Sequence, residues 1–101
     1  MAGIDTTKRP KGGATYTLAT DAAQVVPVPG YATQVDVVCT LGGGRVVSQR
    51  TNTTAAKTAT NMGYLGANIP MTIRLLQDKD TFLVLDNDNA AANTFYLTFF
   101  N

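Results

Sequence analysis

The apolar residues of this chain fall in short runs that alternate with polar residues, and clusters of Gly, Pro, Asn and Asp separate the runs. A period of two is typical of strands with one buried face, and no segment of helical length has the 3.6-residue period of an amphipathic helix. The pattern predicts seven or eight strands, at residues 15–18, 24–28, 33–40, 45–50, 62–66, 71–76, 81–85 and 94–100. We therefore expect an all-β fold, a small antiparallel β-sandwich or barrel that residues 14–101 form as a single domain.

Turn residues between the runs predict how some of the strands are placed. Pro27 has no N–H to give to a ladder, so the strand at 24–28 is expected to lie at a sheet edge or to carry a bulge. Leu41 and the three glycines at 42–44 predict a flexible reversal of the chain, which would make a hairpin of the strands at 33–40 and 45–50.

The last two predicted strands are apolar on both faces, because Phe82 and Val84 oppose Leu83 and Leu85, and residues 94–100 include three phenylalanines. A solvated outer face is normally more polar than this. Two explanations stay open: both strands lie centrally beneath loops, or their second face packs against another subunit.

Residues 1–13 show no apolar periodicity and carry three basic side chains, those of Lys8, Arg9 and Lys11. Pro10 and the two glycines that follow Lys11 predict an extended N-terminal arm that stays loose until something holds it. The arm is either an ordinary frayed terminus or a segment laid on a neighbouring subunit, with its basic groups meeting carboxylates. Three charges without interleaved aromatic residues make a weak patch for nucleic acid, so no nucleic-acid partner is expected.

The composition points away from catalysis. All seven acidic residues are Asp, His and Glu are absent, and Cys39 is the one thiol. These absences remove most of the groups that move protons, attack carbonyls or hold transition metals, so no catalytic, cofactor-binding or metal-binding residue is predicted. Cys39 sits in an apolar run and is expected to be a small buried side chain.

The charge content predicts that part of the surface is buried against partners. Charged residues make up 15% of the chain and the net charge is +1, whereas soluble domains average roughly 25% charged residues. No apolar run has the length of a membrane span, and the N-terminus does not resemble a secretion signal. The chain is expected to be made in the cytoplasm and to stay soluble or join an assembly.

Two acidic motifs have some of the features of a functional site. Asp86 and Asp88 begin like a calcium loop, but Ala90 holds the third ligand position and the closing Glu is absent, so they are retained as the residues to test rather than as a predicted site. Asp78 and Asp80 could form a carboxylate pair, but they fall in what the pattern predicts to be an exposed hairpin turn.

Several segments resemble small virion proteins of tailed bacteriophages. The likeness covers roughly residues 22–100 and rests on a Gln-Val-Val-Pro-Val-Pro strand, an Ala-Thr-Gln-Val-Asp-Val-Val-Cys strand, a Thr/Asn/Ala-rich loop and the phrase Leu-Gly-Ala-Asn-Ile-Pro-Met-Thr-Ile-Arg. The resemblance implies a small β-sandwich that assembles as an oligomer on the particle, as a decoration or cement protein or as a minor tail or neck component. The N-terminal arm lies outside it.

The resulting expectation is a non-enzymatic virion structural protein that forms a homo-oligomer such as a trimer, binds a major capsid or other virion protein and stabilises the particle. It is expected to need no cofactor. The alternative is a carbohydrate- or receptor-binding module that uses the long polar loop at 51–61 and the nearby Tyr64; a hydrolase ranks third. The residues expected to contact partners are Lys8, Arg9 and Lys11 of the arm, Val26 and Val28 of the edge strand, and Phe99 and Phe100 at the C-terminal end.

Overall fold

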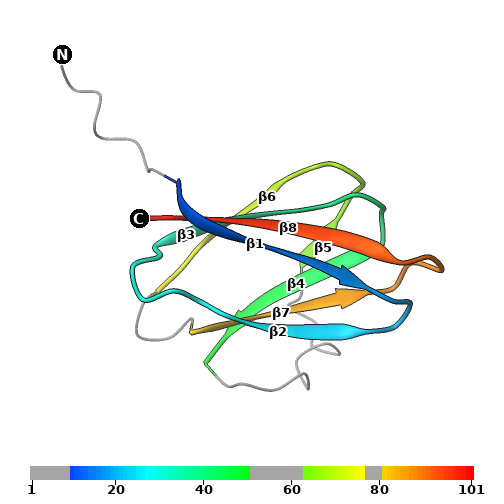
Figure 1. Ribbon diagram of the computed structural model, residues 1–101, viewed down its shortest axis with the longest axis horizontal. Coiled ribbons are helices and arrows are strands. Elements are labelled where there is room, and N and C mark those ends of the chain that lie inside the picture. The colour runs from blue at the N-terminus through cyan, green and yellow to red at the C-terminus, as the bar shows by residue number, and fades with distance from the viewer. Residues whose placement is uncertain (1–9, 51–62, 77–80) are drawn as a thin grey trace, which may run out of the picture.

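The computed structural model describes residues 10–50, 63–76 and 81–101. These residues form eight β-strands in two four-stranded antiparallel sheets that pack face to face (Figure 1). The all-β sandwich expected from the sequence is confirmed. None of the described segments forms an apolar helix of membrane-spanning length. The strands are β1 (Pro10–Leu18), β2 (Ala23–Pro27), β3 (Gln34–Cys39), β4 (Gly44–Gln49), β5 (Gly63–Leu65), β6 (Met71–Arg74), β7 (Phe82–Asn87) and β8 (Asn93–Phe100).

The chain passes back and forth between the two sheets. One sheet, called the β1 sheet below, has the order β1-β8-β3-β6, and the other, the β2 sheet, has the order β2-β7-β4-β5. Among the described strands, β4 and β5 alone are both consecutive and paired. This order of two interleaved four-stranded sheets is that of a jelly roll, also called a double-stranded β-helix.

The predicted hairpin between 33–40 and 45–50 is wrong. β3 pairs with β8 and β6 in the β1 sheet, whereas β4 pairs with β7 and β5 in the β2 sheet. The glycines at 42–44 therefore carry the chain across the sandwich, and Gly43 adopts the left-handed conformation, with φ of 87°. A glycine-rich turn can join two strands of one hairpin or two strands in opposite sheets. Which of these forms depends on the strands with which β3 and β4 pair elsewhere in the chain.

The boundary of the expected arm is also corrected. β1 begins at Pro10, and Pro10, Gly12 and Gly13 pair with the end of β8, with a shift in register at Lys11. A Cβ added to Gly13 would lie 2.7 Å from the carbonyl oxygen of Leu97, and one added to Gly12 would lie 2.5 Å from the hydroxyl of Tyr31. The two glycines thus permit close packing and do not act as a loose joint. Residues 1–9 lie outside the described residues.

The core lies between the two sheets and consists of the inward-facing side chains of both. On β3 it takes Val35, Val37 and Cys39, each fully buried and on the face that the alternation predicts. Cys39 is confirmed as a small buried side chain, and its burial raises the pKa of the thiol. The largest buried side chain is that of Phe95, on β8.

The two strands that are apolar on both faces are central in their sheets. β7 lies between β2 and β4, and β8 lies between β1 and β3, so central placement is confirmed. β2 is an edge strand, as its proline predicts. The outer faces of the two central strands differ, since Val84 on β7 is fully buried together with Val47 on β4, whereas Tyr96 on β8 is 46% exposed.

Candidate functional site

The outer face of the β1 sheet is a broad surface of neutral side chains. Alternation along each strand turns toward it a set of residues that is rich in threonine and includes two aromatic rings. Asp36 and Arg74 are the charged members, and the hydroxyl of Thr72 donates a 2.7 Å hydrogen bond to Asp36. The outward positions are Gly13, Thr15, Thr17, Thr94, Tyr96, Thr98, Phe100, Gln34, Asp36, Val38, Thr72 and Arg74.

This composition suits contact with another protein surface. Interface cores are depleted of charged residues and enriched in tyrosine and phenylalanine. Threonine hydroxyls on the face are already paired in part, as between Thr17 and Thr94 at 3.0 Å. Covering such a face removes few charges from water, so its desolvation is inexpensive.

The strand β1 adds a free sheet edge beside this face. It is nine residues long and pairs with β8 on one side, and no described strand pairs with its other side. The remaining sheet edges are shorter: β2 has five residues and ends in Pro27, β5 has three, and β6 has four. A long edge strand presents unpaired backbone groups to which another strand can bind.

The residues expected to contact partners lie in different environments, some in the core and some at the surface. Val26 and Phe99 are buried in the core, with 1% and 3% of their surface exposed, because both point between the sheets; the expectation that their side chains meet a partner is corrected. Val28 and Phe100 are half-buried, and Lys11 is exposed in β1. Lys8, Arg9 and the loop at 51–61 lie outside the described residues, as do Asp78 and Asp80.

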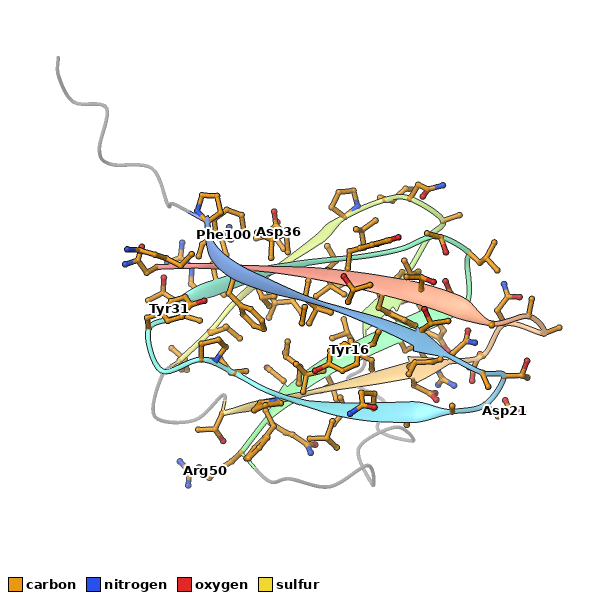
Figure 2. All side chains as sticks on the ribbon, viewed as in Figure 1. Tyr16, Asp21, Tyr31, Asp36, Arg50 and Phe100 are labelled. Atoms are coloured by element: carbon orange, nitrogen blue, oxygen red, sulfur yellow. The ribbon has the colours of Figure 1, made fainter. Side chains whose placement is uncertain are left out.

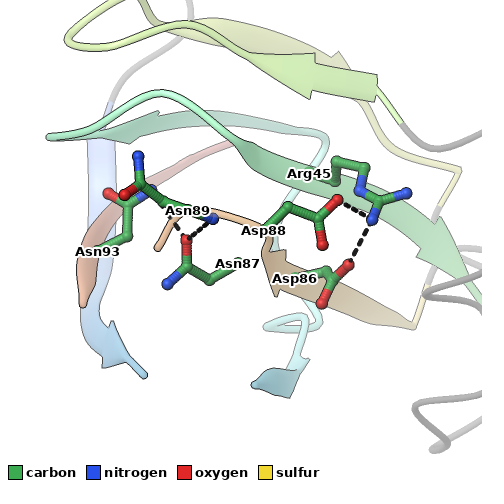
Figure 3. A network of polar contacts seen from close by, with 6 residues as sticks. All are labelled: Arg45, Asp86, Asn87, Asp88, Asn89 and Asn93. Carbon is green, nitrogen blue, oxygen red and sulfur yellow. Dashed lines mark hydrogen bonds and ion pairs between the residues drawn. The ribbon is translucent and has the colours of Figure 1, made fainter. Parts of the chain in front are cut away.

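A second polar cluster lies on the outer face of the β2 sheet, where Tyr64, Arg45 and Asp86 are cross-strand neighbours on β5, β4 and β7. The Nη2 atom of Arg45 lies 3.1 Å from Oδ2 of Asp86 and is also paired with Asp88 (Figure 3). The guanidinium carbon lies 5.5 Å from the centroid of the Tyr64 ring, within cation–π range. Tyr64 is 71% exposed, so the cluster presents to solvent an aromatic ring that packs against the guanidinium group of Arg45.

The same geometry bears on the calcium hypothesis for Asp86 and Asp88. Both carboxylates face the guanidinium group of Arg45 (Figure 3). The side chains of the two neighbouring asparagines make other hydrogen bonds: Asn87 accepts one from the N–H of Asn89, and Asn89 donates one to the carbonyl of Gly42. A cation at this place would have to displace Arg45. Within residues 10–50, 63–76 and 81–101, no three His, Cys, Asp or Glu side chains gather in a way that could hold a metal ion.

Sequence reasoning missed the role of the asparagines in this turn. The Nδ2 atom of Asn87 donates to the carbonyl oxygens of Leu18, Ala19 and Ala91, at 3.0, 3.2 and 3.1 Å. Asn93 pairs through its amide with both the N–H and the carbonyl of Leu41, each at 2.9 Å. The two amides are fully buried and tie three loops together at one end of the sandwich. Their positions in the sequence could have indicated this role, because Asn87 ends the apolar strand β7 and Asn93 begins the apolar strand β8.

A cleft of about 250 Å³ opens beside β4, β5 and β6. Apart from the Ser48 hydroxyl, the described side chains that line it are apolar, and they contain no titratable group. The cleft therefore offers shape and apolar contact without an acid, base or nucleophile. Its described lining residues are Val46, Val47, Ser48, Gly63, Met71 and Ile73.

Comparisons with known proteins support the fold. No protein-family model and no curated protein matches this chain. Among solved structures, the chain is similar to the solution NMR structure of a de novo designed double-stranded β-helix, with a TM-score of 0.64 and 10% sequence identity. The match covers 87% of this chain and 97% of the designed one, so the two share the architecture over nearly their whole length. The likeness shows the fold: this chain is a double-stranded β-helix.

Proposed function

We propose that this chain is a non-enzymatic structural subunit of a bacteriophage virion, which self-associates and binds the capsid surface to stabilise the particle. The observation that carries the proposal is the outer face of the β1 sheet, a neutral surface of threonine, Tyr96 and Phe100 bordered by a free strand edge. The phage assignment within this class of assembly proteins draws on the sequence resemblance, because the jelly roll hosts several functions.

The proposal is tested on particles. Virions purified from the host should contain the chain in amounts that match a repeated site, and a reconstruction at side-chain resolution should show the outer face of the β1 sheet in contact. Replacing Tyr96 with Asp should lower occupancy on the particle at least about tenfold, because it places a charge in the covered face. Ile69→Asp is the matched control, since Ile69 is 64% exposed and lies on the loop between β5 and β6. Particles that lack the chain, or equal occupancy for both variants, would contradict the proposal.

A carbohydrate- or receptor-binding role is the second candidate, and the Tyr64 cluster is the observation that favours it. The exposed ring of Tyr64 can stack on a sugar ring, and Arg45, which lies within cation–π range of this ring, also pairs with the partly exposed carboxylate of Asp88. That carboxylate can accept hydrogen bonds from hydroxyl groups. Isolated protein should then bind glycans on an array, and Tyr64→Ala should abolish the binding. Tyr96→Ala should leave it unchanged, because Tyr96 lies on the other sheet. An array without any signal rules this candidate out.

A further inference from the structure

We infer that β1 of one chain pairs with β1 of a second copy, antiparallel and about a two-fold axis perpendicular to the sheet. The two β1 sheets would then form one continuous eight-stranded sheet. The inference rests on the self-association in the proposed function and specifies the surface that performs it.

The four sheet edges differ in how well they are protected from pairing with another strand. Proteins commonly protect edge strands by keeping them short or by placing proline or charge on them. β2, β5 and β6 are all short, and Pro27 ends β2. β1 has nine residues, and from Gly12 to Leu18 none of them is charged or proline. Pro10, Lys11 and the shift in register between Pro10 and Gly12 protect the first residues of β1, so its unprotected stretch is residues 12–18. This stretch is longer than any of the other three edge strands, and a second β1 is long enough to cover it.

Charged side chains are unevenly distributed along the strand direction, and basic ones gather at one end. Lys11 lies at the start of β1, and Arg74 shares that end of the sheet, since Gln34 pairs with both Phe100 and Arg74. Arg50 follows the end of β4 and lies at the same end of the molecule as Phe100 (Figure 2). Lys8 and Arg9 precede this end in the sequence.

The opposite end of the sandwich is acidic. The N–H of Asp21 donates to the carbonyl of Asn87 at 2.8 Å, which puts Asp21 at the end where Asp86 and Asp88 lie. Arg45 pairs with both Asp86 and Asp88. Figure 2 shows Asp21 and Arg50 at opposite ends of the molecule. Asp36, two residues after Gln34 on β3, also lies near the basic end, beside Phe100 (Figure 2). Among the described residues, the basic end therefore carries Lys11, Arg50 and Arg74 with Asp36, and the acidic end carries Asp21, Asp86 and Asp88 with Arg45. One end is net basic and the other net acidic.

The charge separation selects the orientation of the pair. In an antiparallel arrangement the start of β1 in one copy lies beside the end of β1 in the other, so that each basic end meets an acidic end. A parallel arrangement would bring like ends together. The two-fold axis perpendicular to the sheet also keeps both outer faces on the same side, so the neutral face described above becomes continuous across the dimer.

Cross-linking tests the pairing and its orientation. Native Cys39 is fully buried and should not react, so the unmodified chain serves as the blank. We place the two-fold axis at Thr15, so chains with Thr15→Cys should form a disulfide-linked dimer on mild oxidation, because each Thr15 then faces its own copy. In this register residue 11 faces residue 19, so Lys11→Cys chains should not link to one another but should link when mixed with Ala19→Cys chains. Efficient linking of Lys11→Cys alone, or failure of Thr15→Cys to link, would overturn the inference.

Equilibrium sedimentation supplies a test that needs no oxidation. Thr15→Lys should weaken dimerisation at least about tenfold, because it puts two like charges near the two-fold axis. Thr72→Lys is the matched control, an exposed threonine on the same face but on β6, and should dimerise like the unmodified chain. Circular dichroism confirms that each variant is folded. Equal weakening by both variants, or a monomeric unmodified chain, overturns the strand pairing. Occupancy on the particle is measured in a separate experiment, so the result for the proposed virion function does not depend on the result for the β1–β1 pairing.

Discussion

Replacing Asn87 with Ala is expected to lower the free energy of unfolding by about 3–5 kcal/mol, because a buried polar group left without its partner costs about 1–3 kcal/mol. The substitution removes three donated hydrogen bonds to backbone carbonyls and the acceptor for the N–H of Asn89. Asn87 is fully buried at the end of β7, so water cannot readily replace these contacts. Chemical denaturation monitored by circular dichroism measures the change.

Two further variants separate the amide from the volume of the side chain. Asn87→Asp keeps the size but replaces the donating nitrogen with an oxygen that faces three carbonyls, so it should destabilise the protein at least as much as Asn87→Ala near neutral pH. Asn101→Ala removes an exposed asparagine and should change stability by less than about 0.5 kcal/mol. If Asn87→Ala were as stable as Asn101→Ala, the amide network would not be a major source of stability.

Truncating Phe95 to Ala is expected to cost about 3–5 kcal/mol, since removal of a buried aromatic ring leaves a cavity that the surroundings fill only in part. Phe95 is the largest fully buried side chain and lies on the central strand β8. For a domain of this size the loss corresponds to a fall in melting temperature of roughly 15 °C or more. Differential scanning calorimetry gives both quantities.

The neighbouring residue provides the control for Phe95. Tyr96 is on the same strand but points outward and is 46% exposed, so Tyr96→Ala should cost less than about 1 kcal/mol in the isolated chain. An equal effect of the two substitutions would mean that the alternation of inner and outer faces along β8 is misassigned.

The sequence pattern located the strands well because alternation is a local property. The runs with one apolar face, such as 33–40, correspond to described strands with the predicted face inward. Strand pairing was not predictable in the same way, since it depends on partners far apart in the chain: β1 pairs with β8, and β2 pairs with β7. The proline in β2 was the exception, because the missing N–H is a local property with a consequence for sheet position.

The candidate sites were harder to predict, because the same residue types serve different purposes. Gly12 and Gly13 read as a flexible joint, but here they let Tyr31 and the β8 backbone approach closely. Asp86 and Asp88 read as metal ligands, but Arg45 lies between their carboxylates. In each case the role of the motif depends on a residue from a distant part of the chain, and the sequence around the motif does not predict that contact.

The pairing of the first described strand with the last one also sets the order of events during synthesis. β1 finds its partner in residues 93–100, so the β1 sheet cannot close until that segment has left the ribosome. At about 5–20 residues per second, the nascent chain spends several seconds with β1 made and its natural neighbour absent. During that interval both sides of β1 lack their strand partners, and we expect neighbouring nascent chains on one messenger RNA to compete with β8 for it. Ribosome spacing is therefore a variable that should influence the yield of correctly folded protein.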